Sequence, residues 1–285
     1  MKRLRPARLG FALLIELLAG WAALALRLGP LEAERLSWGM GGAGISAAIS
    51  AFIPRLRRLA VPAFVVLFLA FLGVWSTVKP SNDRDWQVEV SRLPYATFDG
   101  DLVALHNIRN FEYRSETDFT PRWYDKTFDL RELDSVDIVA SYWMGDAIAH
   151  IILSFRFAEG DSVAVSIETR KERSEGYSTV KGFFRNYELY YVVADERDLI
   201  GVRTNHRQSP PEDVYLFRTN APRENVRQAF LDYLREINSR LDTTLPFDEL
   251  KRRSRINEAA KAAGDAPDFS VRIRAAVPRP PRQQE

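Results

Sequence analysis

A histidine and a glutamate in one predicted hairpin are the residues of this chain best suited to chemistry. His150 and Glu168 lie in residues 149–170, AHIILSFRFAEGDSVAVSIETR, where two runs alternate apolar and other side chains around a short turn. This period-two alternation predicts a β-hairpin. An imidazole beside a carboxylate is the pairing of a general base with the acid that orients it. The alternative is a surface ion pair with no catalytic role.

The register of the hairpin decides whether the two side chains meet. A three-residue loop at 159–161 pairs Phe157 with Val163 and gathers the apolar side chains on one face, whereas a two-residue loop would not. With that loop, His150 lies on the other face, diagonal to Glu168, at a Cβ separation of roughly 7–8 Å. We therefore expect the long side chains to reach each other.

The hairpin must be held by a domain that follows a membrane anchor, residues 1–79. The predicted spans are residues 9–28, 38–53 and 59–78. The first and third have the length of a membrane helix, and no clean cleavage site marks the first as a signal peptide. The middle run is weaker and glycine-rich, and a re-entrant segment is the alternative. Counting it as a span places the arginines of 55–58 in the cytoplasm, as the positive-inside tendency requires.

Residues 80–248 form the predicted soluble domain, an α+β domain that is mainly β. The predicted strands, besides the hairpin, are residues 101–108, 137–143, 183–194 and 213–218. A helix is expected next, capped by Thr219 or Asn220. Its apolar stripe predicts packing on the sheet: Val226, Phe230, Tyr233, Leu234, Ile237 and Leu241. Residues 249–285 are rich in Ala, Arg and Pro and are predicted to be disordered.

Composition restricts the chemistry that the chain can perform. There is no cysteine among 285 residues, and the three histidines are spread apart. We therefore expect no metal site, and no glycine-rich or dinucleotide motif indicates a cofactor. The formal net charge of +2 gives no reason to expect a nucleic-acid partner.

Several runs in one order carry a resemblance to a known family. They are PSNDRDW, HNIRNFEYRSETDFTPRWYD, DIVASYW, IAHIILSFRF, SIETRKE, GFFRNYELYYVVADERDLI and VYLFR. Together, from about residue 80 to 241, they resemble the Lnb N-terminal periplasmic domain family. The resemblance implies a papain-like fold in permuted order, anchored in the bacterial inner membrane and facing the periplasm. Its relatives take part in lipoprotein N-acylation, in which a thiol carries the acyl chain, so membrane lipid or lipoprotein is the expected partner.

The resemblance also assigns candidate site residues. His150 matches the family's histidine, Glu168 falls on another patterned motif, and Glu188 is a second acid candidate. The family pattern continues after the long helix with an Asn-Cys-Thr segment that bears the nucleophile. This chain departs from the pattern there and has no cysteine. We attribute the departure to a frameshift or to divergence.

Three readings of the function follow from these residues. The first is a membrane-anchored homologue of a thiol-dependent lipoprotein or lipid acyltransferase that is inactive as written. The second is a non-catalytic lipid- or lipoprotein-binding module at the outer face of the inner membrane. The third is a structural β-domain. The sequence gives no oligomeric state.

Overall fold

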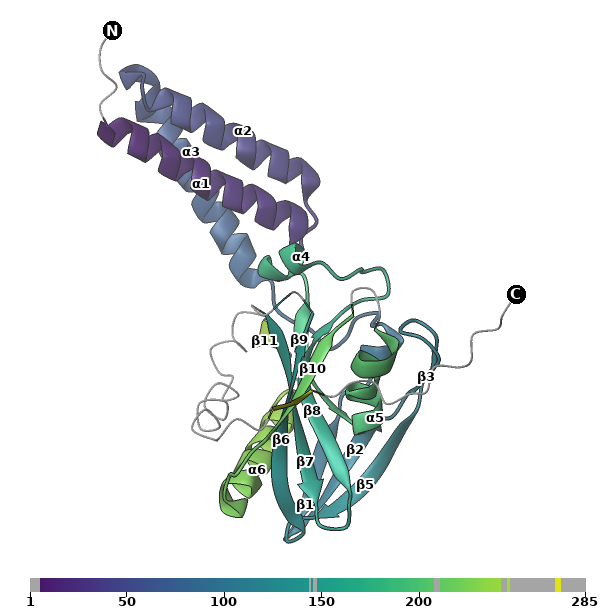
Figure 1. Cartoon of the computed structure of the whole chain (residues 1–285). Helices are drawn as coiled ribbons and strands as arrows, with labels where there is room; N and C mark the ends of the chain where they lie inside the picture. Colours follow the sequence, from purple (N-terminus) through teal and green to yellow (C-terminus); the bar gives the residue numbers. More distant parts are fainter. Residues whose placement is uncertain are drawn as a thin grey trace. The chain divides into compact units, whose positions relative to one another are not determined.

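The chain divides into two compact units. A computed structural model describes residues 6–143, 145, 148–207, 211–241, 245–246 and 270–272. The first unit contains the N-terminal helices and the segment Glu175–Glu188, and the second contains most of a large β-sheet (Figure 1). This mixture of helices and sheet, with a mostly β second unit, confirms the predicted α+β class.

The first unit is built on three helices. They are α1 (Pro6–Leu28), α2 (Glu34–Ser50) and α3 (Pro54–Thr77). By length and composition α1 and α3 can each cross a membrane. Helix α2 has 17 residues, about 25 Å at 1.5 Å per residue. It is not among the candidate spans found in the described residues, so the three-span topology stays a prediction.

The helices pack through small and aromatic side chains. Gly44 of α2 lies so close to α1 that an added Cβ would come within 2.2 Å of the Cβ of Ala19, and small residues allow such an approach. The ring of Trp21 on α1 lies 5.6 Å from that of Phe71 and 6.3 Å from that of Trp75 on α3. Both partners lie toward the C-terminal ends of their helices, so α1 and α3 run in the same direction and α2 returns between them.

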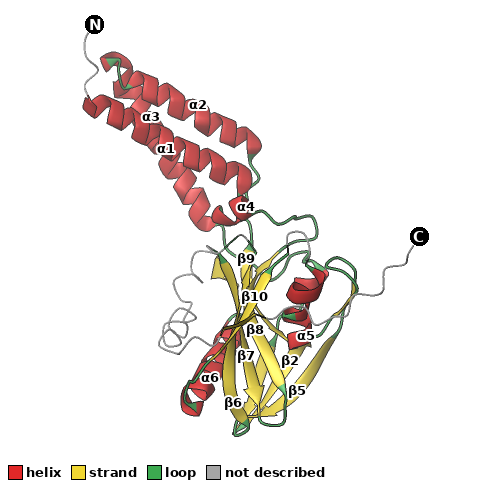
Figure 2. Ribbon diagram, in the orientation of Figure 1, coloured by secondary structure: helices red, strands yellow, loops and turns green. Residues whose placement is uncertain are grey.

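The second unit is built on a mixed sheet in the order β1-β2-β9-β8-β7-β6-β10-β12, with β5 paired to β2 and β11 to β9 (Figure 2). The first six strands are β1 (Tyr95–Asp99), β2 (Leu102–Arg109), β3 (Glu112–Tyr113), β4 (Phe119–Thr120), β5 (Trp123–Asp129) and β6 (Leu133–Tyr142). The others are β7 (Ala149–Phe157), β8 (Ser162–Arg170), β9 (Glu188–Ala194), β10 (Asp213–Arg218), β11 (Leu245–Pro246) and β12 (Ser270–Arg272). Strands β3 and β4 form a separate pair.

Both faces of the hairpin β7–β8 are covered. Helix α6 (Arg223–Ser239) packs on the face of Phe155 and Phe157 through its predicted apolar stripe. Opposite, Leu199 of α5 (Glu196–Leu199) packs with Ile152, and the π-helical turn η2 (Val202–His206) follows α5. The His150 face is therefore largely buried, because α5 and η2 lie over it.

The hairpin register differs from the prediction by two residues. The structure pairs Phe155 with Val163, not Phe157 with Val163. Gly160 has a φ of +85° and is the last loop residue, and the amide of Phe157 donates to the carbonyl oxygen of Asp161 at 2.8 Å. A three-residue loop places its left-handed residue last, so the loop is 158–160. A shift of two keeps every side chain on its predicted face.

Two local predictions were wrong. The segment predicted as a strand from residue 183 begins with the end of a short helix, α4 (Thr179–Phe183), and the strand starts only at Glu188. The N-cap of α6 is Pro222, while the Thr219 hydroxyl donates to the carbonyl oxygen of Val136 at 2.6 Å. Apart from β12, which pairs with β10, the predicted disordered tail lies outside the described residues.

Candidate functional site

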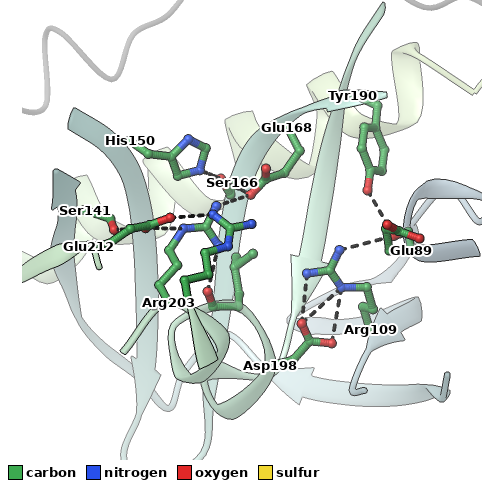
Figure 3. A network of polar contacts seen from close by, with 12 residues as sticks. Glu89, Arg109, Ser141, His150, Ser166, Glu168, Tyr190, Asp198, Arg203 and Glu212 are labelled. Carbon is green, nitrogen blue, oxygen red and sulfur yellow. Dashed lines mark hydrogen bonds and ion pairs between the residues drawn. The ribbon is translucent and has the colours of Figure 1, made fainter. Parts of the chain in front are cut away.

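The hairpin brings His150, Ser166 and Glu168 together. The Nε2 atom of His150 lies 2.7 Å from the Ser166 hydroxyl and 3.2 Å from Oε1 of Glu168 (Figure 3). The Ser166 hydroxyl donates to the same Glu168 oxygen at 3.4 Å. Strands β7 and β8 pair Ile152 with Ser166, two residues along each strand from His150 and Glu168. The predicted meeting of His150 and Glu168 is confirmed.

An arginine from η2 completes the support of Glu168. The Nη2 atom of Arg203 donates to Oε1 of Glu168 at 2.7 Å, and its Nη1 donates to the carbonyl oxygen of Leu199 at 2.9 Å. The Arg203 side chain is 3% exposed, whereas that of Glu168 is 20% exposed. Arg203 is therefore buried, and it supports the carboxylate of Glu168, which is partly exposed to solvent.

The network continues beyond Arg203 to the strand pair β6–β10. The Nη1 atom of Arg207 donates to Oε1 of Glu212 at 2.7 Å, and the hydroxyl of Ser141 donates to the other oxygen. Arg203 Nε lies 3.7 Å from that second oxygen. Sequence reasoning missed Glu212. Its one signal was its position just before a predicted strand, because β10 pairs with β6 and carries Glu212 toward Ser141.

These charges set the ionisation of the two carboxylates. Burial acts to raise the pKa of Glu168, but the charge of Arg203 and the contact with His150 outweigh it and hold that pKa well below its ordinary value. Burial also acts to raise the pKa of Glu212, and Arg207 with the Ser141 hydroxyl lowers it. Both groups are therefore carboxylates at neutral pH.

The geometry defines what His150 can do. A carboxylate accepts hydrogen bonds only, so the contact with Glu168 assigns the imidazole proton to Nε2. Nδ1 is then the unprotonated nitrogen, and among the described residues nothing hydrogen-bonds to it. Ser166 contacts the same nitrogen as Glu168, and its side chain is buried. It therefore holds the ring and is not placed as a nucleophile, because a nucleophile must face the nitrogen that takes its proton.

The third predicted site residue, Glu188, belongs to the first unit. Glu188, at the start of β9, accepts a hydrogen bond from the backbone amide of Ser81 at 2.8 Å. Both residues belong to the first unit, whereas His150 and Glu168 belong to the second. The described contact gives Glu188 a role in anchoring the backbone, and its place in the site stays a prediction.

The arginines of the second unit bind separate partners. Arg109 binds Asp198, Arg114 binds Asp118, Arg122 binds Glu112, and Arg203 binds Glu168. Arg170 donates to the Asn82 side chain at 2.7 Å. Across the described part of the chain, no group of three His, Asp or Glu side chains is arranged to hold a metal ion.

Comparison with known proteins concerns the part of the chain that holds this network. No curated protein and no solved structure matches the chain. One family model does match, and its range begins at residue 119, later than the motifs indicated. It includes His150, Glu168, Glu188, Arg203 and Glu212. Together with the two candidate spans, the family match indicates a membrane-anchored protein with a periplasmic domain. Residues 119–245 match the Lnb N-terminal periplasmic domain family, which confirms the resemblance seen in the sequence.

Proposed function

We propose that this protein is a membrane-anchored homologue of thiol-dependent lipoprotein or lipid acyltransferases that is inactive as written. The observation that carries the proposal is the imidazole of His150, held at Nε2 by Glu168 and Ser166 with Nδ1 left as the acceptor. A thiol acyltransferase needs this arrangement, and the chain contains no cysteine to use it.

The chemistry explains why the missing group is decisive. In thiol acyl transfer the base removes the proton from sulfur, the thiolate attacks the acyl carbonyl, and a thioester forms as the first alcohol or thiol leaves. An amine then attacks the thioester and releases the thiolate. His150 would move the protons in both steps, and Glu168 would stabilise the imidazolium. A serine would need far stronger activation, because its hydroxyl is a much weaker acid than a thiol.

The rest of the proposal concerns fold and location. A permuted papain-like order requires the histidine strand to precede the nucleophile, and β7 does precede α6 and the chain beyond it, where the family pattern has its cysteine.

The parallel course of α1 and α3, with α2 returning between them, is the arrangement that three crossings of the bacterial inner membrane require. It would leave the domain in the periplasm.

The second candidate is a non-catalytic module that binds lipid or lipoprotein. The observation that favours it is the completeness of the His150 network in a chain without a nucleophile. A lipopeptide with an S-diacylglyceryl cysteine should then bind the full chain in detergent, and the same peptide without lipid should not. Equal binding of the two peptides would exclude this candidate.

The test of the first proposal measures acylation directly. The chain would be produced in bacteria that lack lipoprotein N-acylation, and the N-terminus of a model lipoprotein would be analysed by mass spectrometry. We expect a free amine. Acylation by the chain as written would contradict the proposed inactivity.

A chimera tests the homology. The chain after Leu241 would be replaced by the cysteine-bearing segment of a family member. We expect acylation to appear and to be lost in His150→Ala and in a cysteine-to-serine control. Acylation that survives His150→Ala would overturn the role assigned to this histidine.

A further inference from the structure

A short segment between β8 and β9 carries apolar side chains in an exposed position. Within Glu175–Glu188, the exposed fractions are 53% for Tyr177, 56% for Val180 and 69% for Phe183. Val180 and Phe183 are three residues apart in the short helix α4, so they lie on one side of it, and Tyr177 precedes the helix. Exposed apolar groups that gather in this way mark a surface that another apolar phase covers.

The position of the segment indicates what covers its exposed apolar side chains. The segment belongs to the same compact unit as the three helices, and Phe184 packs against their shared core. Gly29, just after α1, has no side chain here, and a Cβ on it would come within 2.8 Å of the Phe184 carbonyl oxygen. Arg185 lies 5.9 Å from the ring centroid of Trp75, in the last turn of α3. The segment therefore lies at the C-terminal ends of both candidate spans.

We infer that this segment, residues 175–188, is a membrane-contact element whose Tyr177, Val180 and Phe183 side chains enter the interfacial layer of the bilayer. Helix α1, with 23 residues, is about 35 Å long, slightly more than the hydrocarbon core of a bilayer. Its end, and that of α3, therefore lie at the headgroup level, where aromatic side chains are enriched. The adjacent Lys181 and Arg185 suit anionic headgroups.

The occupant of this surface is lipid of the membrane that holds the anchor. The outer faces of α1 and α3 are already apolar and exposed, as Leu17 and Val66 show at 67% each. The α4 side chains continue that surface at its end. The inference rests on the membrane anchor and not on acyl transfer, so its failure would leave the role of His150 untouched.

The absence of cysteine makes the test direct, because one introduced cysteine is a unique labelling site. The full chain would be reconstituted in vesicles of phosphatidylethanolamine and phosphatidylglycerol. Val180→Cys and Phe183→Cys would each carry a nitroxide label, and Phe98→Cys on β1, an exposed site of the second unit, would be the matched control. Electron paramagnetic resonance would measure collisions with oxygen and with a water-soluble nickel chelate.

We expect labels at 180 and 183 to collide with oxygen severalfold more, and with nickel severalfold less, than the label at 98. Nickel access equal to that at 98 would overturn the inference, because the segment would then lie in water. Shielding from both reagents would also overturn it, because protein, such as a second copy of the chain, would then cover the surface. Circular dichroism of each variant would verify that the fold is retained.

Discussion

Two arginine–carboxylate pairs hold the segment of α5 and η2 against the sheet, and they differ in how completely they are closed. Asp198 of α5 is fully buried; it accepts from Arg109 Nη2 at 2.8 Å and from the Phe111 amide at 2.7 Å. Glu168 is partly exposed, and besides Arg203 it contacts an imidazole that has an unprotonated nitrogen to spare. Figure 3 shows both pairs in one view.

The difference separates a structural pair from a candidate site. Burial acts to lower the pKa of Arg109, but Asp198 outweighs it and raises that pKa, so the pair stays ionised and all its partners belong to the fold. The Glu168 pair contacts His150, whose Nδ1 can accept a proton from a group outside the network. Breaking the first pair should therefore damage stability, while changing the second should affect stability less and chemistry more.

The largest effect is expected for Asp198→Asn. The change leaves the charge of Arg109 buried without its counter-charge, which costs about 3–4 kcal/mol in the free energy of unfolding. Denaturant unfolding of the full chain in detergent measures it. Asp118→Asn, at a fully exposed pair with Arg114, is the matched control and should change stability little. Equal losses in the two variants would refute the structural role of Asp198.

Glu168→Gln should have a smaller effect. Arg203 loses its closest counter-charge, but Glu212 remains 3.7 Å from its Nε and solvent reaches the site, so we expect a loss of about 2 kcal/mol. The same unfolding measurement applies, with Glu112→Gln at the exposed pair with Arg122 as control. A loss as large as that of Asp198→Asn would mean that the two pairs do not differ in kind.

The pH dependence of that loss has a definite sign. The pKa of Glu168 is lower in the folded chain than its ordinary value of 4.5, so the carboxylate stabilises the fold fully above pH 4.5. Its contribution declines as the pH falls from 4.5 toward the folded pKa. The stability difference between the wild type and Glu168→Gln should therefore be constant from neutral pH to about 5 and shrink below 4.5. A difference that grows on acidification would contradict the assignment.

The smallest effect is expected for His150→Gln. The histidine side chain is partly exposed and contributes contacts at one nitrogen, so stability should change by less than about 1 kcal/mol. The acylating chimera should nevertheless lose its activity in this variant. Destabilisation of several kcal/mol would make His150 a structural residue like Asp198.

The local structure of the site could be predicted from the sequence, but its tertiary contacts could not. Period-two alternation predicted the hairpin and put His150 and Glu168 on one face, and the glycine signalled the turn. The register was wrong by two because the left-handed residue ends the loop, and the pattern of faces is identical after a shift of two.

Arg203 and Glu212 could not be placed from the sequence for a related reason. Arg203 lies within a π-helical turn, and Glu212 lies just before β10. The contact of Arg203 with Glu168 depends on which face of the sheet α5 covers. Nothing in a single sequence states that choice, because both faces of β7 and β8 carry apolar residues.

The protonation of the histidines tests the account most directly. In the full chain labelled with ¹⁵N-histidine, correlation spectra above pH 8 would identify the neutral tautomer of each ring, assigned with His150→Gln. We predict the proton of His150 on Nε2 and that of His106 on Nδ1, because Nδ1 of His106 lies 2.8 Å from Asp125. A proton on Nδ1 of His150 would contradict the account, since that ring could not then accept a proton from a thiol on its open side.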